Sequence, residues 1–170
     1  MIDVFYKAKA LAEIGVKVHL HCFEYGRPHA KELERFCASV HYYPRRTGKH
    51  QLFNGLPYMV VSRRSEALMD RILKDSHPIL FEGLHSCFHL GDPRLIGRKR
   101  LVRAHNVEHD YYMALAKAEG NAFRRTYFIN EARKLQRFEP VLAEADGILA
   151  ISPKDEAYFA GHFDHVTHIP

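Results

Sequence analysis

The sequence predicts an α/β domain in which helices cover both faces of a mostly parallel sheet. Short runs with apolar residues at every second position, or in compact apolar blocks, alternate along the chain with runs that carry apolar residues at helical spacing. This alternation indicates parallel strands, because a crossover helix returns the chain to the start of the next strand. With 170 residues the chain can bury a hydrophobic core, so we expect a single domain over residues 1–170.

The first half of the chain opens with a predicted helix. Val4, Ala8, Leu11 and Ala12 share one face of it, and Gly15 follows as a glycine cap. The other elements expected in this half are a strand over 16–23, a short helix over 29–38, a strand over 39–44, a long mobile loop over 45–57, a strand or core segment over 58–61 and a helix over 65–75.

The second half contains the longest predicted helix, over 123–145, which Pro140 should bend or divide because proline lacks a backbone N–H. A further helix, over 152–160, has Ser152 as its cap and Pro153 at its first position. The strands expected in this half are 78–83, 99–105, 147–152 and 165–170. Together with the first half, these elements predict a Rossmann-like three-layer domain.

The composition is that of a folded protein that works in the cytoplasm. Hydrophobic residues make up 46% of the chain, yet no apolar run approaches the roughly 20 residues that a membrane-spanning helix needs. Charges are spread through the amino-terminal segment, which is therefore not a secretory signal. Cys22, Cys37 and Cys87 are widely spaced and odd in number, which predicts reduced thiols rather than a disulfide framework or a zinc ribbon.

The charge is mildly positive, with 25 basic and 20 acidic residues. This balance suits phosphate-bearing ligands or an anionic membrane surface. The basic residues form no tail, only pairs such as Arg45-Arg46, Arg63-Arg64 and Arg124-Arg125, and each single pair is expected to be ordinary solvated surface. We expect no nucleic-acid partner.

Polar side chains follow three of the predicted strands at their carboxyl ends. Ligands of parallel α/β sheets bind beyond these ends, so the polar groups predict the lining of a cleft. Ser152 also has a full explanation as a helix cap, although the amide groups of the same helix start can meet a phosphate or hydroxyl. Glu82 could equally cap a neighbouring helix. The candidate site residues are Glu82, His85, His105, Asn106, Glu108 and Ser152.

A zinc site is the first alternative for this region. His105, Glu108 and His109 match H-x-x-E-H, in which two histidines on one helix face bind zinc and the glutamate acts as general base. Here the first histidine directly follows the strand-like run LVRA, so a helix that begins at Asn106 would leave it out. A third ligand such as Glu131 is not singled out by the sequence. A zinc-dependent hydrolase is therefore the lesser hypothesis, and no metal ligand is assigned.

Three segments in a fixed order carry a family resemblance: RAHNVEHDYY, FRRTYFINEARKLQRFE and ADGILAISPKDEAYF. With VKVHLHCFEYG near the start, they resemble the amino-terminal half of bacterial family 4 glycosyltransferases of the two-Rossmann-domain (GT-B) type. The resemblance implies transfer of a sugar from a nucleotide-sugar to a glycan or lipid-linked acceptor, with retention of anomeric configuration. It implies no cofactor and no obligatory metal, since the nucleotide-sugar is the donor substrate.

The resemblance also implies roles for individual residues. His105 corresponds to a histidine close to the transferred sugar and is the expected catalytic residue. Asn106 and Glu108 would orient this histidine or contact the acceptor. Glu82 and His85, on the neighbouring strand end, are expected on the acceptor side.

The chain departs from the family at both ends. The family begins with a strand and a glycine-rich turn before the first helix, and it continues into a second Rossmann domain that holds most of the nucleotide. We therefore expect a truncated domain whose first strand is missing, whose partner is the absent carboxy-terminal domain, and which is inactive alone. The missing strand would leave backbone groups of its neighbours unpaired, so pairing of two copies along the open sheet edge is expected.

A non-catalytic module that binds anions or lipid surfaces is the second alternative. Segment 55–60, beside Arg45-Arg46 and Arg63-Arg64, is the place where such contact is expected. The protein would then also lie peripherally on the inner face of the membrane.

Overall fold

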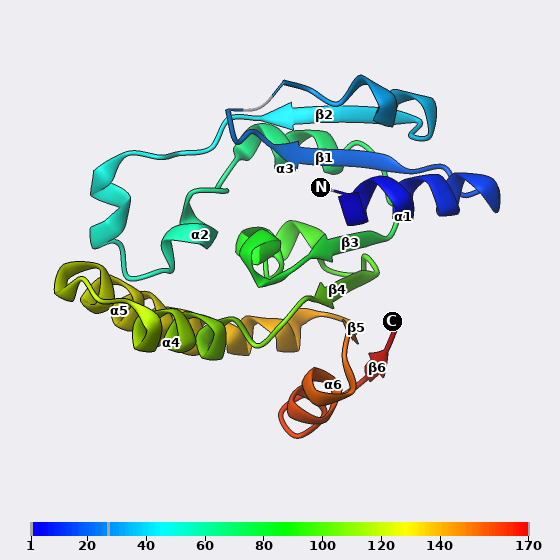
Figure 1. Cartoon of the computed structure of the whole chain (residues 1–170). Coiled ribbons are helices and arrows are strands. Elements are labelled where there is room, and N and C mark those ends of the chain that lie inside the picture. Colours follow the sequence, from blue (N-terminus) through cyan, green and yellow to red (C-terminus); the bar gives the residue numbers. More distant parts are fainter. Residues whose placement is uncertain (1, 27, 170) are drawn as a thin grey trace. The chain divides into compact units, whose positions relative to one another are not determined.

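The computed structural model describes residues 2–26 and 28–169. The chain divides into two compact units. Unit 1 comprises Met1–Arg45 with Ser65–Leu68, and unit 2 comprises Arg46–Arg64 with Met69–Pro170. Each unit contains a sheet whose strands are all parallel, so the predicted α/β class is confirmed (Figure 1). The prediction of a single domain over residues 1–170 stays a prediction.

Unit 1 is built on a pair of parallel strands, β1 (His19–Phe23) and β2 (Ser39–Tyr43). The helix α1 (Ile2–Glu13) precedes them, and the 3₁₀ helix η1 (Lys31–Arg35) connects them in place of the predicted short α-helix. Ala8, Leu33 and Cys37 form the buried core of this unit.

The predicted glycine cap of α1 is confirmed. Gly15 has a φ of 83°, a left-handed conformation in which a side chain would be strained. This conformation lets the Gly15 N–H donate to the Ala12 carbonyl, and the Val16 N–H donate to the Leu11 carbonyl, each at 2.9 Å. Both carbonyls lack a partner in the helix itself, so the turn satisfies them.

Unit 2 contains a four-stranded parallel sheet in the order β3-β4-β5-β6, which Figure 1 shows in succession. Its strands are β3 (Ile79–Glu82), β4 (Arg100–Ala104), β5 (Gly147–Ala150) and β6 (Val166–His168). All four lie where the sequence predicts strands. The described strands of the whole chain are divided between this sheet and that of unit 1, rather than joined in one. Pairing of two copies along an open edge stays a prediction.

Two long helices follow β4 in unit 2, α4 (Glu108–Ala118) and α5 (Ala122–Phe138), and Figure 1 shows them side by side. The apolar spacing of the sequence did not single out α4. The long helix ends at Phe138, and Pro140 stands at the start of the 3₁₀ helix η5 (Glu139–Glu144), so the predicted division at this proline is confirmed. The helix α6 (Pro153–Ala160) follows β5 with Ser152 as its cap, also as predicted.

The segment over 45–61 is more regular than predicted. The 3₁₀ helix η2 (Lys49–Phe53) lies inside the expected loop, and 58–61 forms a turn of helix, α2 (Tyr58–Val61), instead of a strand. Val60 and Val61 are buried, so this part is core, and segment 55–60 does not offer an exposed apolar loop for a lipid surface. The remaining short elements are α3 (Glu66–Ile72), η3 (Leu84–His89) and η4 (Pro93–Leu95).

The core of unit 2 gathers side chains from the sheet and from the helices. Val102 of β4, Ile148 of β5, Leu135 of α5 and Leu142 of η5 are at most 2% exposed. Within the described residues, no helix has both the length and the apolar character that crossing a membrane requires.

Replacement of a core residue of α5 should destabilise the chain. We expect Leu135→Ala to lower the free energy of unfolding by about 2–5 kcal/mol, because it removes a fully buried side chain and leaves a cavity. Urea unfolding followed by circular dichroism measures the loss. Ile96→Ala is the control: its side chain is 79% exposed, and the change should stay within about 0.5 kcal/mol. Equal losses in the two variants would contradict the packing described here.

Candidate functional site

The register of unit 2 brings the ends of β3, β4 and β5 to one edge of the sheet. Glu82 pairs with Arg103, and Ala104 pairs with Ala150, so the three strands finish almost level. His105 directly follows β4, and Ser152 lies two residues beyond the end of β5. The structure therefore places Glu82, His105 and Ser152 at the carboxyl edge, where the sequence predicts a site.

Glu82, Arg103 and His105 form the centre of this edge. The Nε2 atom of His105 lies 3.1 Å from Oε2 of Glu82. Nη1 of Arg103 lies 3.3 Å from the same ring nitrogen and 3.6 Å from the same carboxylate oxygen. The Arg103 side chain is only 10% exposed, while those of Glu82 and His105 are 25% and 31% exposed. Glu82 and His105, which are accessible to a ligand, thus both contact the buried guanidinium of Arg103.

These contacts determine which nitrogen of His105 carries hydrogen. Arginine only donates hydrogen bonds and a carboxylate only accepts them, so Nε2 cannot serve both neighbours at once. The bond to Glu82 is the shorter one and is charge-assisted, so Nε2–H donates to Glu82 and Arg103 pairs with the carboxylate. In this tautomer of the imidazole Nδ1 is an acceptor, and this atom has no hydrogen-bond partner within residues 2–26 and 28–169.

His85 stands beside His105, with ring centroids 6.4 Å apart and the rings nearly perpendicular. The turn at Gly83 puts it there. Gly83 has φ 78° and ψ 158°, a conformation that essentially only glycine adopts. A Cβ at this position would approach the His85 ring to 2.8 Å, so the glycine is needed both for the turn and for the ring above it.

Glu108 and Arg63 add a second pair of charges that is more deeply buried, each residue being 7% exposed. Burial raises the pKa of the Glu108 carboxyl above its ordinary value, although the charges that His105, when protonated, and Arg63 carry oppose the rise. Burial likewise lowers the pKa of Arg63 to about 10, against the effects of Tyr112 and Glu108. The Arg63 guanidinium also donates to the Met59 carbonyl. Arg63 is therefore an interior cation and not part of a solvated pair.

Asn106 and Ser152 differ in what they can offer to a ligand. Asn106 is half-buried, and its side-chain amide has no partner in the described part of the chain. The Ser152 hydroxyl donates to Oδ2 of Asp155 at 2.6 Å and accepts from the Asp155 N–H at 3.1 Å. These bonds support the helix-cap role of Ser152 that the sequence predicts.

The geometry does not fit the H-x-x-E-H zinc pattern. The helix α4 begins at Glu108, so His105 lies outside it, and the two histidines turn to different partners. Nδ1 of His109 lies 3.2 Å from Oε2 of Glu139, whose Oε1 accepts from the Tyr158 hydroxyl at 2.6 Å. His109 thus belongs to a link between α4, η5 and α6. No group of three or more histidine, cysteine, aspartate or glutamate side chains that could hold a metal ion occurs among residues 2–26 and 28–169.

Sequence reasoning missed Arg103 and the interior position of Arg63. One signal for Arg103 was available: it interrupts the apolar run LVRA of a central strand, and a buried arginine needs a partner. No comparable local pattern marks Arg63, which follows the short helix α2. Its burial depends on packing within unit 2.

Two cavities of unit 2 lie away from the strand ends. One, of about 450 Å³, is lined by residues of η5 and by the segment that joins α6 to β6. The other, of about 290 Å³, lies beside α5. None of the predicted site residues lines either cavity.

Comparison with known proteins finds a distant similarity and names no family. No family model and no solved structure matches the chain. An uncharacterized 44.6 kDa protein in the cps region of Klebsiella pneumoniae is 29% identical over 164 residues, which cover 91% of this chain and 42% of that protein. The chain therefore spans less than half the length of the relative it matches.

The turn at Gly83 can be tested by adding a single methyl group. We expect Gly83→Ala to lower the free energy of unfolding. Backbone strain alone should cost about 1–3 kcal/mol, and the clash of the new Cβ with the His85 ring should add to this loss. Gly97→Ala is the matched control, because Gly97 has φ 79° but a Cβ there meets nothing within 4 Å. Equal losses in urea unfolding would mean that the His85 ring does not lie over Gly83.

The buried Glu108 should make stability depend on pH. Because its pKa is raised in the folded state, its contribution to stability is present below the ordinary value of 4.5 and is lost as pH rises through the raised value. Wild type should therefore lose stability relative to Glu108→Gln as the pH rises above the ordinary carboxyl value of 4.5, measured by urea unfolding. The control Glu144→Gln alters an exposed carboxyl. A constant difference between wild type and Glu108→Gln would contradict the burial of this group.

Proposed function

We propose that this chain is the acceptor-side domain of a retaining glycosyltransferase that moves a sugar from a nucleotide-sugar to a glycan or lipid-linked acceptor. The observation that carries the proposal is the pair formed by His105 and Glu82 at the carboxyl edge of a parallel sheet. Its imidazole is partly open to solvent and its carboxylate lies directly behind. The ordered motifs that resemble family 4 glycosyltransferases supply the reaction.

His105 contacts the donor sugar in this proposal. Nδ1 of the neutral ring accepts a hydrogen bond from a sugar hydroxyl, because Nε2–H is already donated to Glu82. The fixed tautomer holds the ring in one orientation before the sugar arrives. Such preorganisation helps catalysis because no group has to reorient as the transition state forms.

Glu82 and Arg103 provide the electrostatic part. The anomeric carbon becomes positively charged as its bond to the nucleotide breaks. A carboxylate that accepts a hydrogen bond from Nε2–H increases the negative charge on Nδ1, the other ring nitrogen. This charge stabilises a positive centre close to Nδ1. Arg103, 3.6 Å from the carboxylate and largely buried, acts as a positioning residue that holds Glu82 in place.

The remaining site residues fall on the acceptor side of the proposal. His85 stands beside His105, and Asn106 has an amide available for a hydroxyl. Glu108 is too deeply buried for direct contact, so its assigned role is to orient His105 electrostatically. The amide groups at the start of α6, capped by Ser152, form the third side of the edge.

The comparison agrees with sugar transfer in a longer protein. The relative's name refers to a cps region, and cps designates capsular polysaccharide, a product of sugar transfer. That relative extends well beyond the length matched by this chain. The proposal assigns the nucleotide contacts to a second domain, in whose absence the chain should be inactive.

Replacement of His105 tests the proposal. In the protein that joins this chain to its donor-binding domain, His105→Ala should lower turnover about a hundredfold or more, because a preorganised contact to the transition state is lost. Stability should change by less than about 1 kcal/mol, since the side chain is partly exposed. Release of nucleoside diphosphate from a panel of nucleotide-sugars, with acceptor glycans present, measures turnover.

His77→Ala is the control for this experiment. His77 is exposed and precedes β3, at the end of the strand opposite to Glu82, so its replacement should leave turnover unchanged. Unchanged turnover in His105→Ala would remove this residue from the chemistry. No transfer with any donor and acceptor in the wild-type protein would overturn the proposed reaction.

A further inference from the structure

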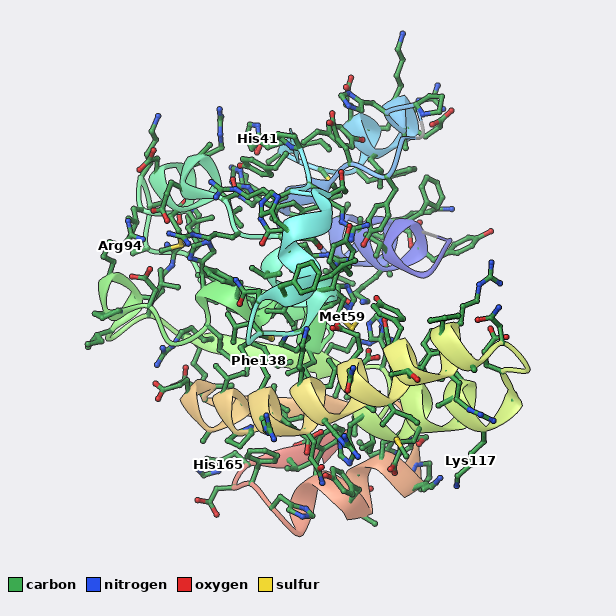
Figure 2. All side chains as sticks on the ribbon, turned by 90° about the vertical axis from the view of Figure 1, so that its left-hand side faces the viewer. His41, Met59, Arg94, Lys117, Phe138 and His165 are labelled. Carbon is green, nitrogen blue, oxygen red and sulfur yellow. The ribbon has the colours of Figure 1, made fainter. Side chains whose placement is uncertain are left out.

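A basic surface of unit 2 lies on α5, and it includes none of the candidate site residues at the ends of β3, β4 and β5. The cavity of about 290 Å³ beside this helix is lined by Leu52 of η2 and by six residues of α5. Figure 2 looks onto this side of the unit, with Phe138 at the end of α5 and Met59 of α2 above it. We call four polar residues of this lining the α5 basic face: the exposed Asn130, Arg133 and Arg137, and the half-buried Lys134.

The charges of the α5 basic face are only partly used inside the protein. Lys134 donates to Glu131 and to the Leu52 carbonyl, both at 2.9 Å, and the buried Glu131 also accepts from the Tyr58 N–H at 2.6 Å. The Lys134 charge is therefore balanced within the fold. The Glu131 carboxylate, which also lines the cavity, has both its oxygens bound by these internal partners.

Arg133 and Arg137 remain without an ion pair or hydrogen bond from their side chains to any residue that the structure describes. They stand four positions apart on an exposed helix face, where like charges repel and destabilise the helix. The fold gains nothing visible from this arrangement. It is explained if an anion outside the chain lies between the two guanidinium groups.

Two exposed phenylalanines flank the same face. Phe53, next in the chain to the cavity residue Leu52, is 90% exposed, and Phe123 in the first turn of α5 is 89% exposed. Steps of four and three residues lead from Phe123 through Tyr127 and Asn130 along the cavity row of α5, so this ring belongs to the same side of the helix. Both rings therefore offer apolar area that a partner could bury.

We propose that the α5 basic face, with Phe53 and Phe123, binds the surface of an anionic lipid bilayer. Basic side chains meet the phosphates of the headgroups, while aromatic rings enter the boundary of the acyl region. A soluble anion would use the arginines but would leave both phenylalanine rings in water. An anionic bilayer offers phosphates for the charges and an apolar boundary for the rings on one surface. This inference does not depend on sugar transfer.

Sedimentation of the full chain with lipid vesicles tests the charges. Binding should occur with phosphatidylcholine mixed with phosphatidylglycerol, should be weak with phosphatidylcholine alone, and should fall as salt is raised. Arg133→Gln and Arg137→Gln should each weaken binding about fivefold, and together roughly thirtyfold. The paired variant Lys99→Gln, Lys154→Gln is the control, since it removes the same charge from exposed sites outside α5.

The sequence contains no tryptophan, so one introduced indole reports on a single position. Phe53→Trp should shift its emission to the blue on anionic vesicles and be quenched by brominated lipid chains. Ile96→Trp, at a side chain that is 79% exposed and lies outside α5, should show neither effect.

Three outcomes would overturn the proposal. The first is equal binding by the arginine and lysine double variants. The second is an unchanged Phe53→Trp emission on vesicles that the protein binds. The third is complete competition by inorganic phosphate at concentrations where raised salt has no effect, which would assign the arginines to a soluble anion.

Discussion

The register between β3 and β4 is the constraint on which the candidate site depends. Parallel partners that are level with each other project to the same face, so the pairing of Glu82 with Arg103 brings carboxylate and guanidinium together. His105 follows Arg103 by two positions and so continues on that face. A slip of one residue would turn Arg103 toward the other face and separate all three groups. The apolar residues of the same strands resist that slip, because it would move the fully buried Val102 out of its packed position.

Charge balance is the second requirement of this region. Glu82 and Glu108 stand against Arg103 and Arg63, and most of these groups are largely withdrawn from water. Removing one partner from such a set leaves a buried charge without compensation, which costs more than the pair contributes. His105 is the member of the network that remains open on one side. The buried charges therefore hold the partly exposed imidazole of His105 in place.

Local patterns predicted the parts of the fold that depend on neighbours in sequence. The glycine cap at Gly15, the serine cap at Ser152 and the division of the long helix at Pro140 each follow from one residue and its conformational limits. The contact between Arg103 and Glu82 could not be predicted in the same way, since it depends on which strands pair and in which register. The burial of Arg63 likewise depends on packing between distant segments of unit 2.

Glu139 has a consequence for the loops that carry the site. Its two carboxylate oxygens bind His109 of α4 and Tyr158 of α6, and these helices follow the loops that leave β4 and β5. A displacement of either helix would strip one partner from a carboxylate that is only 6% exposed, so the opposite helix resists it. Glu139 thus couples the two loops through the helices that follow them. A ligand that displaces one loop should therefore also shift the position of the other.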